Sequence, residues 1–350
     1  MSSDTLVRAH AASVTSRPDL PPVGNTPLVP IRIRVAGRWR NVWLKLEGRN
    51  PTGSSKDRAA LALLSDLEAR GRLTPASIVV ESTSGNLGVG LACLCRALGN
   101  AFIAVIDPKT TPENRAKMQS FGALLELVDT PDPSGGYLLS RLRRVEEICA
   151  QSARYVWTDQ YGNPAHPECH RQTTAPEIDR QMHGRVPAIF VAVSTGGTLA
   201  GIGRYFRDVS PATRVIAVDA QGSVVFGGSP HPRKLTGIGS ARASTFIRRE
   251  HYDGHVLVTD RDAFAMCRAV ADAVDLRVGG SSGAVLAACV ECLAADASLT
   301  DVVCICPDAG ENYRSTIFAD AWLVDGGFNP AERPAVVEDI TPAAAEDTGS

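Results

Sequence analysis

One lysine of the chain stands where its side chain can do covalent chemistry. The sequence contains 36 basic residues, of which only five are lysines, so arginine carries most of the positive charge. Lys56 follows the glycine- and hydroxyl-rich residues 51–55 and precedes Asp57, at the expected first turn of a helix. The helix dipole disfavours a positive charge there, and an amine that is easily uncharged can attack an aldehyde to form a Schiff base. A purely structural lysine is the alternative that the residues alone leave open.

Three glycine-rich turns could bind anions. They are residues 82–86 (Ser-Thr-Ser-Gly-Asn), 194–198 (Ser-Thr-Gly-Gly-Thr) and 279–283 (Gly-Gly-Ser-Ser-Gly). Each turn opens a predicted helix, where free backbone N–H groups and the helix dipole favour a phosphate or a carboxylate. Taken singly, each turn could instead be only a helix N-cap with Ser or Thr as the capping residue. The sequence has neither the dinucleotide-binding fingerprint nor a Walker phosphate loop.

The elements that must position these residues alternate along the chain. From residue 42 onward, short β-branched runs alternate with amphipathic segments, a pattern typical of βαβ units around a mostly parallel sheet. In such sheets, ligands bind at the carboxyl ends of the strands. We therefore predict a doubly wound α/β fold. The predicted strands are 42–46, 77–80, 102–106, 124–128, 188–193, 215–218, 256–258 and 302–306, and the predicted helices are 57–69, 85–97, 113–120, 137–150, 198–209, 262–274 and 283–294.

The composition excludes some classes of function. A hydrophobic fraction of 44% and a charged fraction of 21% in 350 residues indicate a globular protein with a large buried core. The formal net charge of −2 argues against nucleic acid or an anionic membrane as a partner. Residues 1–17 lack the apolar region of a secretory signal, and no uncharged stretch is long enough for a membrane helix. We therefore expect a cytoplasmic enzyme that acts on small molecules.

The nine cysteines indicate reduced thiols, because their number is odd and they are scattered along a long chain. Cys289 and Cys292 form a CxxC pair, but in an Ala-, Val- and Leu-rich segment where cysteines are ordinary core residues. His166, Cys169 and His170 have ligand-like spacing, yet no second cluster completes a tetrahedral site. We predict no metal site and no redox centre.

Five sequence blocks resemble the cysteine synthase/cystathionine β-synthase family. They are residues 24–28 (GNTPL), residues 45–58 (KLEGRNPTGSSKDR) and the three glycine-rich turns, in the order and spacing of the family from about residue 22 to residue 323. The resemblance implies the fold-type II pyridoxal phosphate architecture, with two doubly wound open-sheet domains and the cofactor in the cleft between them. It also implies a homodimer.

The same resemblance suggests domain limits. Residues 21–165 would form an N-terminal α/β domain, part of whose start packs on the other domain, and residues 166–326 would form a C-terminal α/β domain. Residues 1–20 are expected to be a flexible tail. Residues 327–350 are rich in Pro, Ala, Glu and Asp without helical periodicity, and are expected to be a disordered acidic tail.

The resemblance implies a role for each matching residue. Lys56 would hold pyridoxal 5′-phosphate as a Schiff base and, once the substrate has displaced it, would take the Cα proton. A serine hydroxyl facing the pyridine nitrogen supplies no negative charge, so elimination at Cβ would be favoured over transamination. The other cofactor contacts would be Asn86 at the 3′-oxygen, Ser281 at the pyridine nitrogen, and Ser194, Thr195, Gly196, Gly197 and Thr198 around the phosphate.

Departures from the usual sulfhydrylase pattern point to the substrates. Ser194 stands where Gly is usual, Tyr161 where Phe is usual, and Leu87 where Thr is usual. Residues 218–227 and 237–242 resemble the branch of the family that joins O-phospho-L-serine to L-glutamate. That branch makes N-(2-amino-2-carboxyethyl)-L-glutamate, a precursor of 2,3-diaminopropionate in siderophore or antibiotic biosynthesis. The resemblance to this branch extends to residues 135–138, 141, 307–308, 313 and 320–323.

The substrates would be held by hydrogen-bond donors and by arginines. Thr83 and Ser84, with their backbone N–H groups, would bind the α-carboxylate. A dianionic phosphate leaving group requires more donors than an acetyl group does. Tyr161, Arg141 and Ser194 are the predicted donors to the phosphate, and Arg242 is predicted to pair with the carboxylates of glutamate. Gln160 is a further predicted substrate contact. Because Arg141 lies beside two further arginines, a solvated basic helix face is the alternative for it.

The expected reaction is a β-replacement with ping-pong order, because phosphate leaves before glutamate adds to Cβ. Closure of the smaller domain, which carries residues 82–86, would exclude water. The product would pass to a pathway dehydrogenase. A cysteine synthase that uses O-acetylserine or O-phosphoserine with sulfide is the alternative function, and a non-catalytic regulatory subunit is a third reading.

Overall fold

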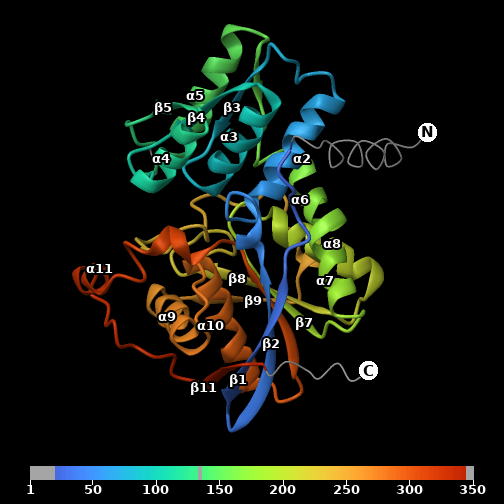
Figure 1. Ribbon diagram of the computed structural model, residues 1–350, viewed down its shortest axis with the longest axis vertical. Helices are drawn as coiled ribbons and strands as arrows, with labels where there is room; N and C mark the ends of the chain where they lie inside the picture. Colours follow the sequence, from blue (N-terminus) through green and yellow to red (C-terminus); the bar gives the residue numbers. More distant parts are fainter. Residues whose placement is uncertain (1–19, 133–135, 344–350) are drawn as a thin grey trace. The chain divides into compact units, whose positions relative to one another are not determined.

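The computed structural model describes residues 20–132 and 136–343 (Figure 1). Backbone contacts divide them into two compact units: unit 1 holds the described residues up to 24 and residues 50–170, and unit 2 holds residues 25–49 and the described residues from 171 onward. The sequence analysis placed the boundary at residues 165 and 166. In the structure it lies after His170, because helix α6 (Ala165–Cys169) packs against helix α2 (Lys56–Ala69) of unit 1.

Unit 1 is built on a parallel sheet of four strands in the order β5-β4-β3-β6. Adjacent side chains of β3 point to opposite faces, as they must in a strand. Val79 packs with the helices α2 and α3, whereas Val80 packs with α5. The sheet therefore has helices on both faces. The elements are β3 (Ile78–Ser82), α3 (Asn86–Leu98), β4 (Ala101–Ile106), α4 (Pro112–Ser120), β5 (Leu124–Leu127), α5 (Leu138–Gln151) and β6 (Tyr155–Trp157).

Unit 2 is built on a sheet of seven strands. Its strands are β1 (Leu28–Val35), β2 (Arg38–Leu46), β7 (Ala188–Ala192), β8 (Arg214–Ala220), β9 (Gly254–Val258), β10 (Asp301–Cys306) and β11 (Val337–Pro342). The spatial order is β11-β1-β2-β10-β7-β8-β9, parallel from β2 to β9, with β1 antiparallel to both of its neighbours. The helices and helical turns are η1 (Glu47–Arg49), η2 (His170–Thr174), α7 (Ala175–Gln181), α8 (Gly197–Val209), η3 (Arg249–His251), α9 (Asp260–Val274), α10 (Gly280–Ala295), η4 (Gly310–Tyr313) and α11 (Asp320–Asp325).

The faces of this second sheet are also covered on both sides. Along β10, Val302 and Cys304 belong to the core that includes α9 and α10, whereas Val303 and Ile305 belong to the core that includes α7 and α8. Figure 1 shows α9 and α10 on one side of these strands and α7 and α8 on the other. The predicted doubly wound α/β class is therefore confirmed in each unit.

Strand β11 overturns one expectation. The segment from residue 327 was expected to be a disordered tail, yet β11 pairs antiparallel with β1, and Ile340 lies opposite Ile33. The Ile340 side chain is buried in the core of unit 2, and the pairing covers what would otherwise be the exposed edge of β1. The described residues do not include residues 344–350 of the predicted C-terminal tail or residues 1–19 of the predicted N-terminal tail. The first described residue, Leu20, packs against the core of α2 and α3.

The cysteines of the chain are buried or half-buried thiols. All nine are free, and Cys289 and Cys292 lie on α10. Cys289 is fully buried beside Cys304 of β10, and burial raises the pKa of Cys292 to about 11. A thiol that stays protonated at neutral pH is a poor nucleophile and a poor metal ligand. No helix in the described residues is long and apolar enough to span a membrane.

Candidate functional site

Lys56 is the first residue of α2, and the turn before it is held by Asp57. The Asp57 carboxylate accepts hydrogen bonds from the backbone N–H of Thr52 at 2.7 Å and from the Thr52 hydroxyl. The backbone N–H of Lys56 donates to the Ser54 hydroxyl oxygen at 3.2 Å. Gly53 has a φ of +94°, the left-handed region that glycine reaches without strain. These contacts fix the direction of the chain into α2, so the half-buried Lys56 side chain leaves from a rigid helix start.

Two buried histidines face this lysine from within unit 1. His166 and His170 are fully buried, and the His166 Nδ1 lies 2.9 Å from the Gln160 carbonyl oxygen. Burial, and then the charge of Lys56, lowers the pKa of His166 to about 4. Burial lowers the pKa of His170 further, with His166, Arg58 and Lys56 adding to it. Both imidazoles are therefore neutral near pH 7 and add no positive charge near the lysine.

The turn of residues 82–86 joins β3 to α3. Gly85 is the N-cap residue of α3 and has no side chain of its own to cap the helix. The Thr83 hydroxyl oxygen accepts the backbone N–H of Gly88 at 3.0 Å, and the Thr83 side chain is buried. Ser84 and Asn86 are half-buried, whereas Leu87 lies in the core of unit 1. Of the predicted contacts in this turn, Ser84 and Asn86 are the more accessible side chains.

Sequence reasoning missed a carboxylate next to this turn. Glu81 is fully buried near the end of β3, and each of its two oxygens accepts two hydrogen bonds. Oε1 accepts the backbone N–H of Ser82 at 2.8 Å and the Trp157 indole N–H at 3.3 Å. Oε2 accepts the backbone N–H of Gln160 at 3.1 Å and the Thr158 hydroxyl. Burial raises the pKa of Glu81 to about 7 against these bonds. An ionisable residue inside the apolar run of residues 78–82 was the signal that could have revealed it.

Gln160 and Tyr161 follow β6 at the same edge of the sheet. The Gln160 side chain is buried, and its Nε2 donates to the Ser82 carbonyl oxygen at 2.9 Å. That amide therefore connects the two loops of unit 1. Tyr161 is half-buried and is the residue of this pair with exposed surface.

Arg141 does not lie on a solvated basic face. Its side chain in the first turn of α5 is only 9% exposed, and its Nε lies 3.2 Å from the Asp107 Oδ2 after β4. Its Nη1 is buried and has no hydrogen-bond partner among the described residues. By contrast, Arg144 pairs at the surface with Glu126 and Glu147. Arg141 is thus a buried cation at the carboxyl edge of the unit 1 sheet, and its Nη1 is a donor with no acceptor among the described residues.

In unit 2, residues 194–198 form a cradle at the start of α8. Gly196 is the N-cap residue with a φ of +89°, and no side chain caps the helix. A Cβ on Gly196 would lie 2.3 Å from the Ser244 Oγ and 2.7 Å from the Ile247 Cγ1. The Ser244 hydroxyl donates to the Thr195 carbonyl oxygen at 2.6 Å. The segment of residues 239–247 therefore packs against the turn, and this packing requires glycine at position 196.

Two predicted substrate residues belong to this cradle and to the segment packed against it. The Ser194 hydroxyl donates to the Gly239 carbonyl oxygen at 3.1 Å, so its hydrogen is already engaged. Arg242 is half-buried, and its backbone N–H donates to the Ser240 hydroxyl oxygen at 3.0 Å. The sequence analysis placed both residues in contact with substrate. In the structure Ser194 also ties the turn to that segment.

Ser281 lies in the first turn of α10 and is buried. A Cβ on Gly237 would lie 3.9 Å from both the Ser281 Oγ and the Tyr313 Oη, so these two hydroxyls border one space. The Tyr313 hydroxyl donates to the Asp308 Oδ2 at 2.7 Å, and burial, with Asp308 next, raises its pKa. The polar atoms nearest this space are therefore neutral hydroxyls. Tyr313 was noted in the sequence analysis only as part of a family resemblance.

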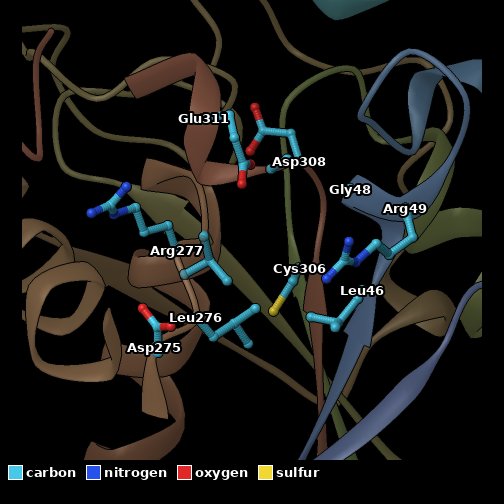
Figure 2. A pocket seen from close by; sticks show the side chains of 11 residues that line it. Leu46, Gly48, Arg49, Asp275, Leu276, Arg277, Cys306, Asp308 and Glu311 are labelled. Atoms are coloured by element: carbon cyan, nitrogen blue, oxygen red, sulfur yellow. The ribbon is translucent and has the colours of Figure 1, made fainter. Parts of the chain in front are cut away.

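A cavity of about 410 Å³ in unit 2 lies beside the third glycine-rich turn, because Val278 and Asp308, which adjoin Gly279, line it (Figure 2). Figure 2 shows Arg49 and Arg277 on opposite sides of this view, with the carboxylates of Asp308 and Glu311 above them. No site residue predicted from the sequence lines this cavity. Its lining combines guanidinium and carboxylate groups, which does not select for an anion, so the cavity is not the phosphate cradle.

The residues present fit pyridoxal phosphate. At Gly196 an added Cβ would collide with Ser244 and Ile247, so the turn requires glycine at a helix N-terminus of the kind that binds phosphate groups. Lys56 offers an amine at a rigid helix start, and Ser281 offers a buried neutral hydroxyl for a pyridine nitrogen. The chemistry of the donor set therefore matches the phosphate, aldehyde and ring nitrogen of the cofactor.

Comparisons with known proteins agree with this fit. Residues 20–308 match the family model described as "Pyridoxal-phosphate dependent enzyme". A curated N-(2-amino-2-carboxyethyl)-L-glutamate synthase of Ralstonia nicotianae is 40% identical over 301 residues, covering 86% of this chain and 89% of the relative. The synthase of the same name from Cupriavidus metallidurans is 39% identical over 305 residues, with the same coverage. An O-acetylserine dependent cystathionine beta-synthase of Helicobacter pylori has a similar structure, with a TM-score of 0.77 and 29% identity over 84% of this chain and 95% of that one. The expected family and cofactor are therefore confirmed, and the chain belongs to the pyridoxal phosphate-dependent enzymes.

Proposed function

We propose that this enzyme is a β-replacement synthase that joins O-phospho-L-serine and L-glutamate to give N-(2-amino-2-carboxyethyl)-L-glutamate and phosphate. The observation that carries the proposal is the 40% identity to a curated synthase of that name over 86% of the chain. Retention of Lys56, Asn86 and Ser281 argues against a non-catalytic subunit. The product is a step toward 2,3-diaminopropionate.

Each group of the cofactor would meet one of the residues predicted for it. Lys56 would bind its aldehyde, Asn86 its ring oxygen, residues 194–198 its phosphate and Ser281 its ring nitrogen. When bound, pyridoxal phosphate withdraws electrons from the substrate, which makes the Cα–H acidic and lets a leaving group depart from Cβ. Once the substrate amine has displaced it from the aldehyde, the free ε-amine of Lys56 would be the general base that takes the Cα proton. Ser281 hydrogen-bonds without a charge of its own, which favours elimination over transamination.

The substrate α-carboxylate would bind the backbone N–H groups at the start of α3, with Ser84 beside them. For the departing phosphate, Arg141 is the strongest candidate among the predicted donors, because its Nη1 is buried without a partner in the described residues. Tyr161 would add a hydroxyl donor. Ser194 would contribute after its hydroxyl turns away from Gly239. Arg242 would pair with the carboxylates of glutamate.

A matrix of donors and acceptors tests the proposal. The purified holoenzyme is incubated with O-phospho-L-serine or O-acetyl-L-serine, each with L-glutamate or sulfide, and the products are identified by mass. We expect the pair of O-phospho-L-serine and L-glutamate to react fastest, and initial rates to follow the parallel-line pattern of a ping-pong mechanism. Cysteine formation that outpaces glutamate addition by orders of magnitude would instead establish a cysteine synthase.

We further propose that the enzyme is a cytoplasmic homodimer whose product is used by a pathway dehydrogenase. The free thiols support a reducing compartment. Light scattering of the purified protein measures the oligomeric state, and a monomer at micromolar concentration would contradict the dimer.

A further inference from the structure

Glu81 lies where the hydrogen-bond ladder between β3 and β6 ends. The ladder pairs Ile78 with Tyr155 and continues only to Val80 and Trp157. The next backbone contact, from the Thr158 N–H to the Val80 carbonyl oxygen, is already stretched to 3.4 Å. Beyond this point β6 has ended, whereas β3 continues beside β4 to Ser82. The segment after β6 therefore needs another source of registration against β3.

The Glu81 side chain supplies that registration. It accepts the backbone N–H of Ser82 on its own strand, and on the neighbouring segment it accepts the Trp157 indole, the Thr158 hydroxyl and the Gln160 backbone N–H. In the other direction, the Gln160 side-chain amide donates to the Ser82 carbonyl oxygen at 2.9 Å. One buried carboxylate thus links the beginning of the 82–86 turn to the segment that carries Tyr161.

We propose that Glu81 is a positioning residue whose ionised carboxylate locks residues 82–86 to residues 158–161, so that the amino-acid substrate meets a preformed carboxylate-binding turn. The proposal rests on the function proposed above, which assigns that turn to the substrate. Only the ionised carboxylate can accept from all four donors, because a protonated oxygen must itself donate and then opposes an N–H or O–H. Truncating the side chain would leave those donors buried without an acceptor.

The charge state of Glu81 changes in the neutral range. Burial raises its pKa from 4.5 to about 7, while the bonds from Thr158, Gln160, Trp157 and Ser82 act in the opposite direction. From α5, the Cys149 thiol faces the carboxylate. Burial and then the charge of Glu81 raise the pKa of that thiol, and Arg72 opposes them, so the thiol remains neutral. The lock therefore forms as the pH rises through about 7.

Stability and substrate binding then depend on pH with opposite signs. The pKa of Glu81 is higher in the folded protein than its ordinary value of 4.5, so its protonated form stabilises the fold. This stabilisation is complete below pH 4.5 and is lost as the pH rises through about 7. Substrate binding improves over the same range, because the ionised lock forms. A carboxylate with a merely structural role would not improve binding while the fold weakens.

The test compares the wild-type holoenzyme with Glu81→Gln and Glu81→Asp, and with Glu126→Gln as a matched control at a surface ion pair. Tryptophan fluorescence is titrated from about pH 6 to about pH 8, and the signal of Trp157→Phe is subtracted to remove the contribution of the other tryptophans. The melting temperature and the KM for O-phospho-L-serine are measured across the same pH range. We expect a fluorescence transition near pH 7 in the wild type that is absent in Glu81→Gln. At the upper pH, Glu81→Gln should raise KM about tenfold with kcat changed by less than about threefold.

Several results would overturn the proposal. A folded Glu81→Gln enzyme with wild-type KM at every pH contradicts the lock, as does a Trp157 transition that persists in that variant. If Glu81→Gln fails to fold, Glu81→Asp becomes the deciding variant, because aspartate keeps the charge but is too short to reach both segments. A wild-type KM in Glu81→Asp would also overturn the proposal. Inactivity toward O-phospho-L-serine would reject the proposed function alone, since the fluorescence and melting titrations need no substrate.

Discussion

Replacing Gly196 by Ala tests the cofactor cradle most directly. The residue has a φ of +89°, which costs a non-glycine residue roughly 1–2 kcal/mol. The new Cβ would lie 2.3 Å from the Ser244 Oγ, so Ser244 must turn away and lose its bond to the Thr195 carbonyl, worth about 1 kcal/mol. Moving Ile247, 2.7 Å from the new atom, adds roughly 1–3 kcal/mol. The total is roughly 3–6 kcal/mol, concentrated at the phosphate cradle.

Gly37→Ala is the matched control for this change. Gly37 also has a left-handed φ, +71°, but an added Cβ would meet nothing within 4 Å, so it bears only the backbone strain. Each variant is stripped of cofactor and titrated with pyridoxal phosphate, following the visible absorption band, and the melting temperature of the apo form is recorded. We expect Gly196→Ala to bind the cofactor at least about tenfold more weakly than Gly37→Ala, since each tenfold corresponds to about 1.4 kcal/mol.

The clash can also be relieved in a second variant. Ser244→Gly in the Gly196→Ala background removes the closest atom, and we expect it to restore part of the cofactor affinity. Equal affinity of Gly196→Ala and Gly37→Ala, with equal apo melting temperatures, would refute the assignment of residues 194–198 as the phosphate cradle.

Three further outcomes follow from the geometry. Arg141→Met should raise the KM for O-phospho-L-serine at least about tenfold, whereas Arg144→Met, which removes surface ion pairs, should change it less than about twofold; equal effects would return Arg141 to a structural role. Ending the chain after residue 336 should lower the melting temperature by several degrees relative to ending it after residue 343, because the burial of Ile340 and the β1–β11 pairing are lost; equal melting temperatures would contradict this. Because the pKa of His166 is lowered from 6.5 to about 4, its contribution to stability is present above pH 6.5 and lost as the pH falls toward 4; His166→Gln should flatten the melting temperature in that interval, and an unchanged acid dependence would count against it.

The parts of the site that could be predicted are those encoded locally. A hydroxyl- and glycine-rich turn before a helix is recognisable from neighbouring residues, because the φ angles and N–H groups it needs depend on five or so consecutive positions. Lys56 and the turns around Gly85, Gly196 and Ser281 were found in this way, and the family and cofactor inferred from them are confirmed. Most strands and helices were likewise placed to within a few residues, since hydrophobic periodicity is also a local property.

The unpredicted parts depend on partners far away in the chain. Glu81 reads as one acid in an apolar strand, and only its contact with residues 157–160 makes it a link between two loops. Arg141 belongs to a basic run in the sequence, and its ion pair with Asp107 across two elements removes it from solvent.

The sequence by itself determined which groups can do chemistry: an amine at a helix start, helix N-termini that attract anions, and neutral hydroxyls. The tertiary structure alone decided the rest. Residues 25–49 join unit 2 because β2 pairs with β10, and β11 joins because it pairs with β1. Strand pairing satisfies backbone groups hundreds of residues apart, and burial sets the charge of groups such as Glu81. Neither effect leaves a periodic trace in the local sequence, because each arises only when distant segments meet.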